Sequence, residues 1–575
     1  MCGILVSAGL RRPTSHRDLA SLRPRGPDGI GFWCDPHVTM AQTRLAIIGL
    51  TERVTGPLED DSHVLAYNGE IYNFEDIRSR LKQVGVSLAE ANDSEVLLHA
   101  WTRWGAEVLK ELHGFWAFVV YDKVRRTLTL VRDQFGVKPL YYYTRGREVC
   151  VATTLRTVLE GTNMSPTLNF EALSEYAAYQ FTFGDKTFVE GVHKVLPGHI
   201  VEIDLSSGHV VSRAYEDIFA LAADEPVAPD GDWVAETRSL LSSCILQSTL
   251  ADVPFATLCS GGIDSSLVTR ITRPELAYHC NYSDPECNET FFAKQAVEGT
   301  STRLYVVNAS ESFNLVNRLA SIIDDFDDPT VGSVVLPLDE LLARVGQRHR
   351  VVLTGTGGDE LFGGYVRYQL ALGVCLQDSY RGMFDRLQAV PVVADRFEMC
   401  HRKGRVDYFR FYDEGVETTF RKSFEECRQT EDDGDAMVTF DRRHFLAALL
   451  NIDDRIAGRH AIEGRPSLLH QRFVRHVCRV RPSDLLQGEL KGVFRSIAAP
   501  LLPPAIARRT DKMGFTTPIG VFAQRSWDRI REQLMSSPFK DLYDLTHFTA
   551  RSDDKFSREV FGLLMVDLWL NRYAA

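Results

Sequence analysis

The chain starts with Met1 followed by Cys2, so removal of Met1 would leave a cysteine as the first residue. The thiol and the α-amine of an N-terminal cysteine belong to one residue and lie close together. Because an α-amine has a pKa of about 8, part of it is neutral at pH 7 and can accept the proton of the thiol. Cys2 could therefore supply both the nucleophile and the base of a covalent reaction.

A glycine- and serine-rich segment, residues 260–266 (Ser-Gly-Gly-Ile-Asp-Ser-Ser), follows the apolar residues 255–259 and is expected to open a helix. Glycine lets a backbone approach a ligand closely, and serine hydroxyls at a helix N-terminus suit an anion. The segment is not a Walker loop, which needs Gly-Lys-Ser or Gly-Lys-Thr. Because Asp264 would repel a phosphate unless a cation lay between them, the segment predicts a phosphate site with Mg²⁺.

A second glycine-rich segment, residues 354–359 (Thr-Gly-Thr-Gly-Gly-Asp), follows the apolar residues 351–353. Ligands of a parallel sheet bind beyond the carboxyl ends of its strands. Asp264 and Asp359 would each follow such a strand end. We therefore expect the two carboxylates to hold one Mg²⁺ between them.

The first two hundred residues contain short β-branched and aromatic segments, such as residues 64–67, 117–121 and 127–131, separated by turn residues. Segments of this composition and length are typical of strands. A helical stretch starts near Asp93. This mixture predicts an α+β domain of stacked sheets with covering helices.

In the second half of the chain, short strands near residues 253–259, 277–280 and 350–353 alternate with helical segments. Such alternation predicts an α/β domain built on a parallel sheet. An acidic, turn-rich stretch, residues 425–437, is expected to be a surface loop. The domain boundaries that we expect are 2–210 for the first domain, 211–232 for a linker and 233–575 for the second domain.

The chain has 575 residues, too many for one hydrophobic core, and a net charge of −12. That charge argues against broad nucleic-acid binding, which needs a basic face. Neither an apolar run of membrane-spanning length nor a signal-peptide pattern is evident, so no membrane contact is expected. The eleven cysteines are dispersed, which favours reduced thiols and a cytoplasmic location.

Residues 260–266 resemble the Ser-Gly-Gly-x-Asp-Ser loop of the ATP-pyrophosphatase family, in the version found in asparagine synthetases. Residues 354–365 resemble the asparagine synthetase segment Ser-Gly-Glu-Gly-x-Asp-Glu-x-Phe-Gly-Gly-Tyr, and residues 490–495 are similar to that family's Lys-x-x-x-Arg helix. The resemblance implies that Lys491 contacts the phosphates and stabilises charge in the transition state. The ATP contacts that it implies are Cys259, Ser260, Gly261, Gly262, Asp264, Ser265, Asn281, Thr354 and Gly355.

The first half of the chain resembles the glutaminase domain of the same family, a class II glutamine amidotransferase of the N-terminal-nucleophile hydrolase type. Residues 67–73 (Tyr-Asn-Gly-Glu-Ile-Tyr-Asn) match a loop of that domain. The resemblance implies that Cys2 is the nucleophile, with the Asn68 side chain and the Gly69 N–H as the oxyanion hole. The glutamine-binding residues that it implies are Arg44 for the α-carboxylate, Asn68 and Gly69, and Glu70 and Asp93 for the α-ammonium.

The two resemblances together cover almost the whole chain and imply a glutamine-dependent amide ligase of the asparagine synthetase B type. Its substrates would be glutamine, ATP and aspartate. Through an acyl-adenylate it would form asparagine and release glutamate, AMP and pyrophosphate. A homodimer is one possible oligomeric state of such a protein.

Two departures from the family pattern leave other functions open. Thr356 stands where the family commonly has an acid, whose role would be lost, unneeded or moved to Glu360. Residues 467–470 (Ser-Leu-Leu-His) stand in place of the family's Phe-Leu-Asp. One alternative is therefore a ligase of the same type that amidates a different carboxylate. A second is a glutaminase with a regulatory ATP-binding half, and a third is a scaffold without catalysis.

Overall fold

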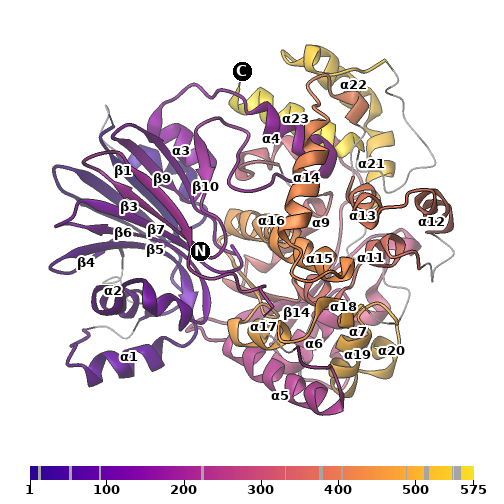
Figure 1. Cartoon of the computed structure of the whole chain (residues 1–575), viewed down its shortest axis with the longest axis horizontal. Coiled ribbons are helices and arrows are strands. Elements are labelled where there is room, and N and C mark those ends of the chain that lie inside the picture. The colour runs from indigo at the N-terminus through magenta and orange to yellow at the C-terminus, as the bar shows by residue number, and fades with distance from the viewer. Residues whose placement is uncertain are drawn as a thin grey trace.

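The computed structural model describes residues 1–10, 15–50, 55–89, 92–221, 226–329, 332–374, 380–402, 406–486, 488–509, 517–546, 548 and 559–574. Two β-sheets make up one half of the molecule, and a largely helical body around a smaller sheet makes up the other (Figure 1). The N-terminus lies where the two halves meet (Figure 1).

The first half contains two six-stranded antiparallel sheets. In spatial order, the first sheet consists of β10 (Val192–Lys194), β8 (Tyr141–Arg145), β9 (Glu148–Ala152), β1 (Gly3–Ala8), β3 (Val38–Arg44) and β2 (Gly29–Cys34). The second consists of β12 (Val210–Ala214), β11 (His199–Asp204), β7 (Thr127–Arg132), β6 (Gly114–Asp122), β5 (His63–Ile71) and β4 (Leu58–Glu59).

The two sheets pack face to face through side chains that alternate along their strands. Ile4 and Val6 of β1 share a buried core with Ala117 and Val119 of β6, because every second residue of a strand faces the partner sheet. Helices pack on the outer faces, namely α1 (Phe74–Gln83) and α2 (Asp93–Trp104) on the second sheet and α3 (Leu155–Thr162) on the first. This arrangement confirms the predicted α+β domain of stacked sheets.

The second half is built on a five-stranded sheet in which every pair of neighbouring strands is parallel. Its spatial order is β15 (Arg303–Asn308), β14 (Leu276–Asn281), β13 (Phe255–Leu258), β16 (Val351–Thr354) and β17 (Glu463–Pro466). The helices packed on it include α5 (Gly231–Gln247), α6 (Ile263–Thr272), α7 (Thr290–Val297), α9 (Val335–Val345) and α16 (Leu446–Arg459). The predicted α/β domain on a parallel sheet is therefore confirmed.

Further helices extend this half. They are α8 (Leu315–Ala320), α10 (Gly358–Phe362), α11 (Val366–Ala371), α12 (Arg381–Gln388), α13 (Val393–His401), α14 (Gly415–Glu426), α15 (Asp433–Phe440), α17 (Gln471–Val477), α18 (Pro482–Leu485), α19 (Gly492–Ala498), α20 (Pro504–Ala507), α21 (Ile519–Arg525), α22 (Trp527–Ser536) and α23 (Glu559–Tyr573). α4 (Phe170–Tyr179), from the first half of the chain, lies beside α23 (Figure 1). Across the ranges that the structure describes, none of the helices has the length and apolar character needed to cross a membrane.

The expectation of a surface loop over residues 425–437 is wrong at both ends, because only residues 427–432 lie outside helices. α14 ends only at Glu426, and α15 starts at Asp433. The carboxylate of Asp432 accepts the N–H of Gly434 at 2.7 Å, so part of the acidic run caps a helix. Met437 is fully buried.

The predicted linker, 211–232, overlaps regular structure at both ends. β12 continues the second sheet to Ala214, and α5 begins at Gly231. Residues 222–225 lie outside the described residues. The domain boundaries themselves remain a prediction.

Candidate active sites

Cys2 lies immediately before β1 and reaches across to the second sheet. Its backbone N–H donates to Asn68 Oδ1 on β5 at 2.8 Å. Asn68 is fully buried, and its Nδ2 has no hydrogen-bond partner among the described residues. A buried, unpaired N–H group calls for an acceptor, and an oxyanion formed beside Cys2 is such an acceptor.

Gly69 is required by the close packing of β5 on β6. A Cβ atom at this position would lie 2.4 Å from the Phe115 carbonyl oxygen and 2.7 Å from Trp116 Cα. Both are backbone atoms that cannot move aside without disturbing the sheet. The Asn-Gly pair is therefore part of a continuous strand, not of a hairpin turn.

Two buried carboxyl groups lie here: Glu70 belongs to β5, and Asp93 is the first residue of α2 beside it. Asn92 starts α2 by accepting the N–H of Glu95, and Asp93 then accepts hydrogen bonds from Tyr67 Oη at 2.7 Å and Ile71 N at 3.2 Å. Burial raises the pKa of Asp93 to about 6. Burial and the neighbouring Asp93 raise the pKa of Glu70 well above its usual value. Two adjoining carboxyl groups of this kind favour a bound cation.

Arg44 ends β3, and its guanidinium donates to the backbone oxygens of Ile48 at 3.3 Å and of Gly49. Burial raises the pKa of the Cys2 thiol, while the chain's terminal amine and, more weakly, Arg44 lower it. The thiol thus needs a base in order to react at neutral pH.

Met1 is buried at the junction of the two halves. Its sulfur accepts from Arg25 Nη2 at 3.5 Å, and burial lowers the pKa of its amine to about 5. Arg25 also contacts the Cys2 carbonyl oxygen at 3.5 Å and Asp454 Oδ2 at 2.8 Å. The environment of Cys2 is therefore shaped by α16 of the second half as well as by its own domain.

The second site is centred on Lys491. Its ammonium lies 2.8 Å from both carboxylate oxygens of Asp264 and 2.7 Å from Asp359 Oδ1. Burial lowers the pKa of Lys491, but the two carboxylates outweigh burial and raise it. Lys491 precedes α19 in the left-handed conformation, with φ of 57°, a backbone strain that often occurs at functional sites.

The glycine-rich segments bring these carboxylates together. A Cβ atom on Gly358 would lie 1.9 Å from Asp264 Oδ1, and one on Gly364 would lie 1.9 Å from Asp359 Oδ1. Any larger residue at either position would push the carboxylates apart. The two segments therefore meet at the carboxyl ends of β13 and β16.

A cavity of about 240 Å³ opens beside these groups. Ser260 and Ser265 form one side, with their hydroxyls 3.0 Å apart at the start of α6. The predicted residues that line the cavity are Cys259, Ser260, Asp264, Ser265, Thr354, Gly355 and Asp359. Those outside its lining are Gly261, Gly262, Asn281 and Lys491. Asn281 instead donates from Nδ2 to Asn308 at 3.1 Å, at the end of β14.

Two other acids, Asp453 and Glu360, line the cavity in which Thr356 replaces the acid that is common in the family. Thr356 Oγ1 donates to Asp453 Oδ2 at 2.7 Å, a contact that sequence reasoning missed because the two residues are 97 positions apart. Burial raises the pKa of Asp453 to about 6. Burial and the adjacent Asp359 raise the pKa of Glu360 to about 7, and Tyr365 donates to its carboxylate.

Buried charges connect the two halves, and a small cavity lies beside the ATP cavity. Arg465 on β17 pairs with Glu463 at 2.8 Å and reaches Glu70 of the glutaminase-like half at 3.2 Å. A cavity of about 20 Å³ is lined by Val137 of the first half and by Asp453 and Asp454 of the second, among others. It shares four lining residues with the larger cavity, namely Leu258, Leu338, Thr354 and Asp453.

Comparison with protein families decides what these two halves are. A model of the glutamine amidotransferase domain matches residues 1–216, and the asparagine synthase model matches residues 236–571. The chain belongs to the asparagine synthase family. The sequence-based recognition of this family, with its amidotransferase domain, is confirmed.

Curated relatives in the family are a quarter to a third identical to this chain over the segments that align. Asparagine synthetase [glutamine-hydrolyzing] 1 of Bacillus subtilis is 32% identical over 61% of this chain and 55% of its own length. Asparagine synthetase [glutamine-hydrolyzing] 3 of the same organism is 25% identical over 88% of this chain and 86% of its own length. A protein of Gibberella zeae named amidase chry2 is 28% identical over 59% of this chain and 54% of its own length. The chain thus spans little more than half the length of the first and third of these relatives.

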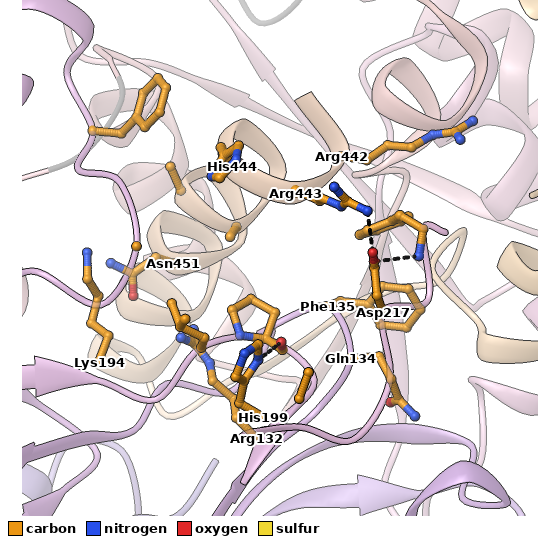
Figure 2. Close-up of a pocket in the computed structure, with 18 of the residues that line it drawn as sticks. Arg132, Gln134, Phe135, Lys194, His199, Asp217, Arg442, Arg443, His444 and Asn451 are labelled. Carbon is orange, nitrogen blue, oxygen red and sulfur yellow. Dashed lines mark hydrogen bonds and ion pairs between the residues drawn. The ribbon is translucent and has the colours of Figure 1, made fainter. Parts of the chain in front are cut away.

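This asparagine synthase family member also has a larger cavity, of about 410 Å³, between its halves (Figure 2). Two arginine side chains that line this cavity already have partners within the protein. Arg443 pairs with Asp217, and Arg132 donates to three backbone oxygens. The residues predicted from the sequence to form the glutaminase and ATP sites are absent from its lining.

Proposed function

We propose that the chain is a glutamine-dependent amide ligase that forms asparagine from aspartate, with glutamine as nitrogen donor and ATP as the activating substrate. Membership of the asparagine synthase family implies use of ATP. The geometry of the two sites supports a division of the reaction between the halves.

In the first half, Cys2 attacks the side-chain amide of glutamine and forms a thioester with release of ammonia, which water then resolves to glutamate. Removal of Met1 supplies the α-amine as base for the thiol. The unpaired Asn68 Nδ2 and the Gly69 N–H stabilise the oxyanion. Glu70 and Asp93 bind the α-ammonium of glutamine, and Arg44 binds its α-carboxylate.

In the second half, aspartate attacks the α-phosphate of ATP to form an acyl-adenylate and pyrophosphate. Ser260 and Ser265 bind phosphate at the start of α6, and Lys491 stabilises the charge that develops.

The Asp264 and Asp359 carboxylates fit a magnesium site, because both already converge on one cation, the Lys491 ammonium. Mg²⁺ is commonly bound by one or two carboxylates together with substrate phosphates. When bound here it would neutralise phosphate charge.

The observation that carries the proposal is the contact between the two halves beside Cys2. Arg25 contacts both Cys2 and Asp454, and Asp454 lines the small cavity that adjoins the ATP cavity. Ammonia released at Cys2 would need to be kept from bulk water to reach the adenylate in neutral form.

A second candidate is a ligase with the same chemistry but a different carboxylate. Thr356 favours it, because the cavity lacks a carboxylate at that position and presents Asp453 instead. His470, in the departing segment 467–470, is turned to Gln247 at 2.8 Å.

A screen of carboxylic acids for pyrophosphate release, with glutamine, ATP and Mg²⁺ present, tests both candidates. Asparagine formation with aspartate supports the first, and turnover only with another acid supports the second. Glutamate release without pyrophosphate under any acid would show that neither is right.

A further inference from the structure

Thr356 and Asp453 form a hydroxyl–carboxylate pair within the ATP cavity. Thr356 follows β16, and Asp453 projects from α16, which packs beside it. The hydroxyl of Thr354 donates to Thr356 at 3.2 Å, and that of Thr356 donates to Asp453 Oδ2 at 2.7 Å. The Thr356 hydroxyl thus holds one carboxylate oxygen, and no hydrogen bond to the other oxygen of Asp453 occurs among the described residues.

Asp453 lies where the small cavity joins the ATP cavity. Of the four described residues that line both, the others being Leu258, Leu338 and Thr354, it alone has an ionisable side chain. A molecule that moves from the small cavity into the ATP cavity would therefore meet this carboxyl group beside two leucine side chains.

The charge environment of Asp453 suits a base. No ion pair to it occurs among the described residues, whereas its neighbour Asp454 is paired with Arg25 at 2.8 Å. Burial raises the pKa of Asp453 to about 6, Asp454 adds to the increase, and the hydrogen bond from Thr356 opposes it. A carboxylate with a pKa moved toward neutrality accepts protons more effectively than one of ordinary pKa.

Glu360 is the other acid to be considered for such a role. It lines the ATP cavity but not the small cavity, and the Tyr365 hydroxyl is bonded to it. It also lies next to Asp359, which we place at the magnesium site. Its place in the lining of both cavities therefore favours Asp453 over Glu360.

We propose that Asp453, positioned by Thr356, is the base that accepts a proton from ammonia as ammonia attacks the activated carboxylate. The inference rests on the proposed ligase function and adds a catalytic residue to it. The nitrogen lone pair forms a bond to the acyl carbon, and one proton of the nitrogen passes to the Asp453 carboxylate. The bond between that carbon and the AMP oxygen then breaks, and AMP leaves with the electron pair.

The test compares two nitrogen nucleophiles in Asp453→Asn, with aspartate as the acid. The nitrogen of ammonia becomes a weakly acidic ammonium centre as it attacks and needs a base to lose a proton. Hydroxylamine is less basic and a stronger nucleophile, so its attacking nitrogen loses a proton to water more readily. We expect amide formation from ammonium chloride to fall by about 100-fold or more in the variant, the usual scale of general-base catalysis. Hydroxamate formation from hydroxylamine and glutamate release from glutamine should stay within about threefold of wild type.

Two further variants sharpen the comparison. Thr356→Val removes the positioning hydroxyl and should lower amide formation less than Asp453→Asn does. It should leave hydroxamate formation unchanged. Thr356→Ser, which keeps a hydroxyl, should retain amide formation. Asp385→Asn, at a side chain that is 64% exposed on α12, is the matched control and should behave as wild type.

The outcomes separate this inference from the function on which it rests. Wild-type amide formation by Asp453→Asn overturns the inference alone. Equal loss with ammonia and hydroxylamine overturns it too, because it shows that Asp453 supports the fold or the adenylation step. Absence of aspartate-dependent pyrophosphate and hydroxamate from the wild-type enzyme overturns the proposed asparagine synthesis itself.

Discussion

Replacement of Lys491 by methionine tests the ATP site most sharply, because one side chain neutralises two carboxylates there. The ammonium makes contacts of 2.8, 2.8 and 2.7 Å, and the Lys491 and Asp264 side chains are each only 8% exposed. Breaking a buried charge pair costs about 3–5 kcal/mol. Because the Asp359 side chain is 37% exposed, solvent screens part of this charge, so we expect about 3 kcal/mol.

That loss has a measurable size in thermal unfolding. With an unfolding entropy of roughly 2 cal/mol/K per residue and a unit of roughly 340 residues, 3 kcal/mol lowers the melting temperature by about 4 °C. Mg²⁺ without ATP should recover more of the melting temperature in Lys491→Met than in wild type, because its two carboxylates have lost their cation.

Activity gives a second readout of the same variant. Acid-dependent pyrophosphate release should fall by about 100- to 1000-fold, the usual cost of removing one charge-stabilising group. Glutamate release should persist, since Lys491 is remote from Cys2 in the other half. Lys422→Met, at a side chain that is 78% exposed on α14, is the matched control. Pyrophosphate release within threefold of wild type, or an unchanged melting temperature, would refute the reasoning.

Three further predictions concern the first half. Cys2→Ala should abolish glutamine-dependent synthesis and leave ammonia-dependent synthesis intact; loss of both in a product assay would contradict the split of roles. Gly69→Ala should impair glutamate release, because its Cβ would lie 2.4 Å from the Phe115 carbonyl oxygen, and the retained ammonia-dependent activity serves as its folding control. Normal glutaminase activity in Gly69→Ala would mean that β5 can shift without harm. Since burial raises the pKa of Asp93 to about 6, its carboxylate is lost as the pH falls through 6. The KM for glutamine should therefore rise below pH 6, and a KM that stays constant from pH 7 to pH 5 would contradict ammonium binding at Asp93.

Local sequence patterns predicted the layers of the fold well. β5 and β6 lie where β-branched and aromatic segments occur, and both of their faces are buried, one against the first sheet and the other against helices. The acidic run 425–437 misled because aspartates that start a helix resemble those of a loop. The meeting of Asp264 and Asp359 was predictable, because both follow strands of one parallel sheet.

Contacts between distant segments were beyond reach of the sequence. Thr356 pairs with Asp453 across 97 residues, and Arg465 reaches Glu70 across 395. Both contacts depend on how α16 and β17 pack against other elements, and no local sequence pattern predicts either of them. Lys491 was expected on a helix, yet it precedes α19 in a left-handed conformation.

Transfer of nitrogen-15 from the side-chain amide of glutamine to the product tests the central claim most directly. The wild-type enzyme, given labelled glutamine, aspartate, ATP and Mg²⁺, should form asparagine labelled in its side-chain amide, with one pyrophosphate per asparagine. An excess of unlabelled ammonium chloride in solution should dilute this label only weakly, because the nitrogen passes between the halves inside the protein. Labelled ammonia that accumulates in solution, without labelled amide or pyrophosphate, would contradict the account.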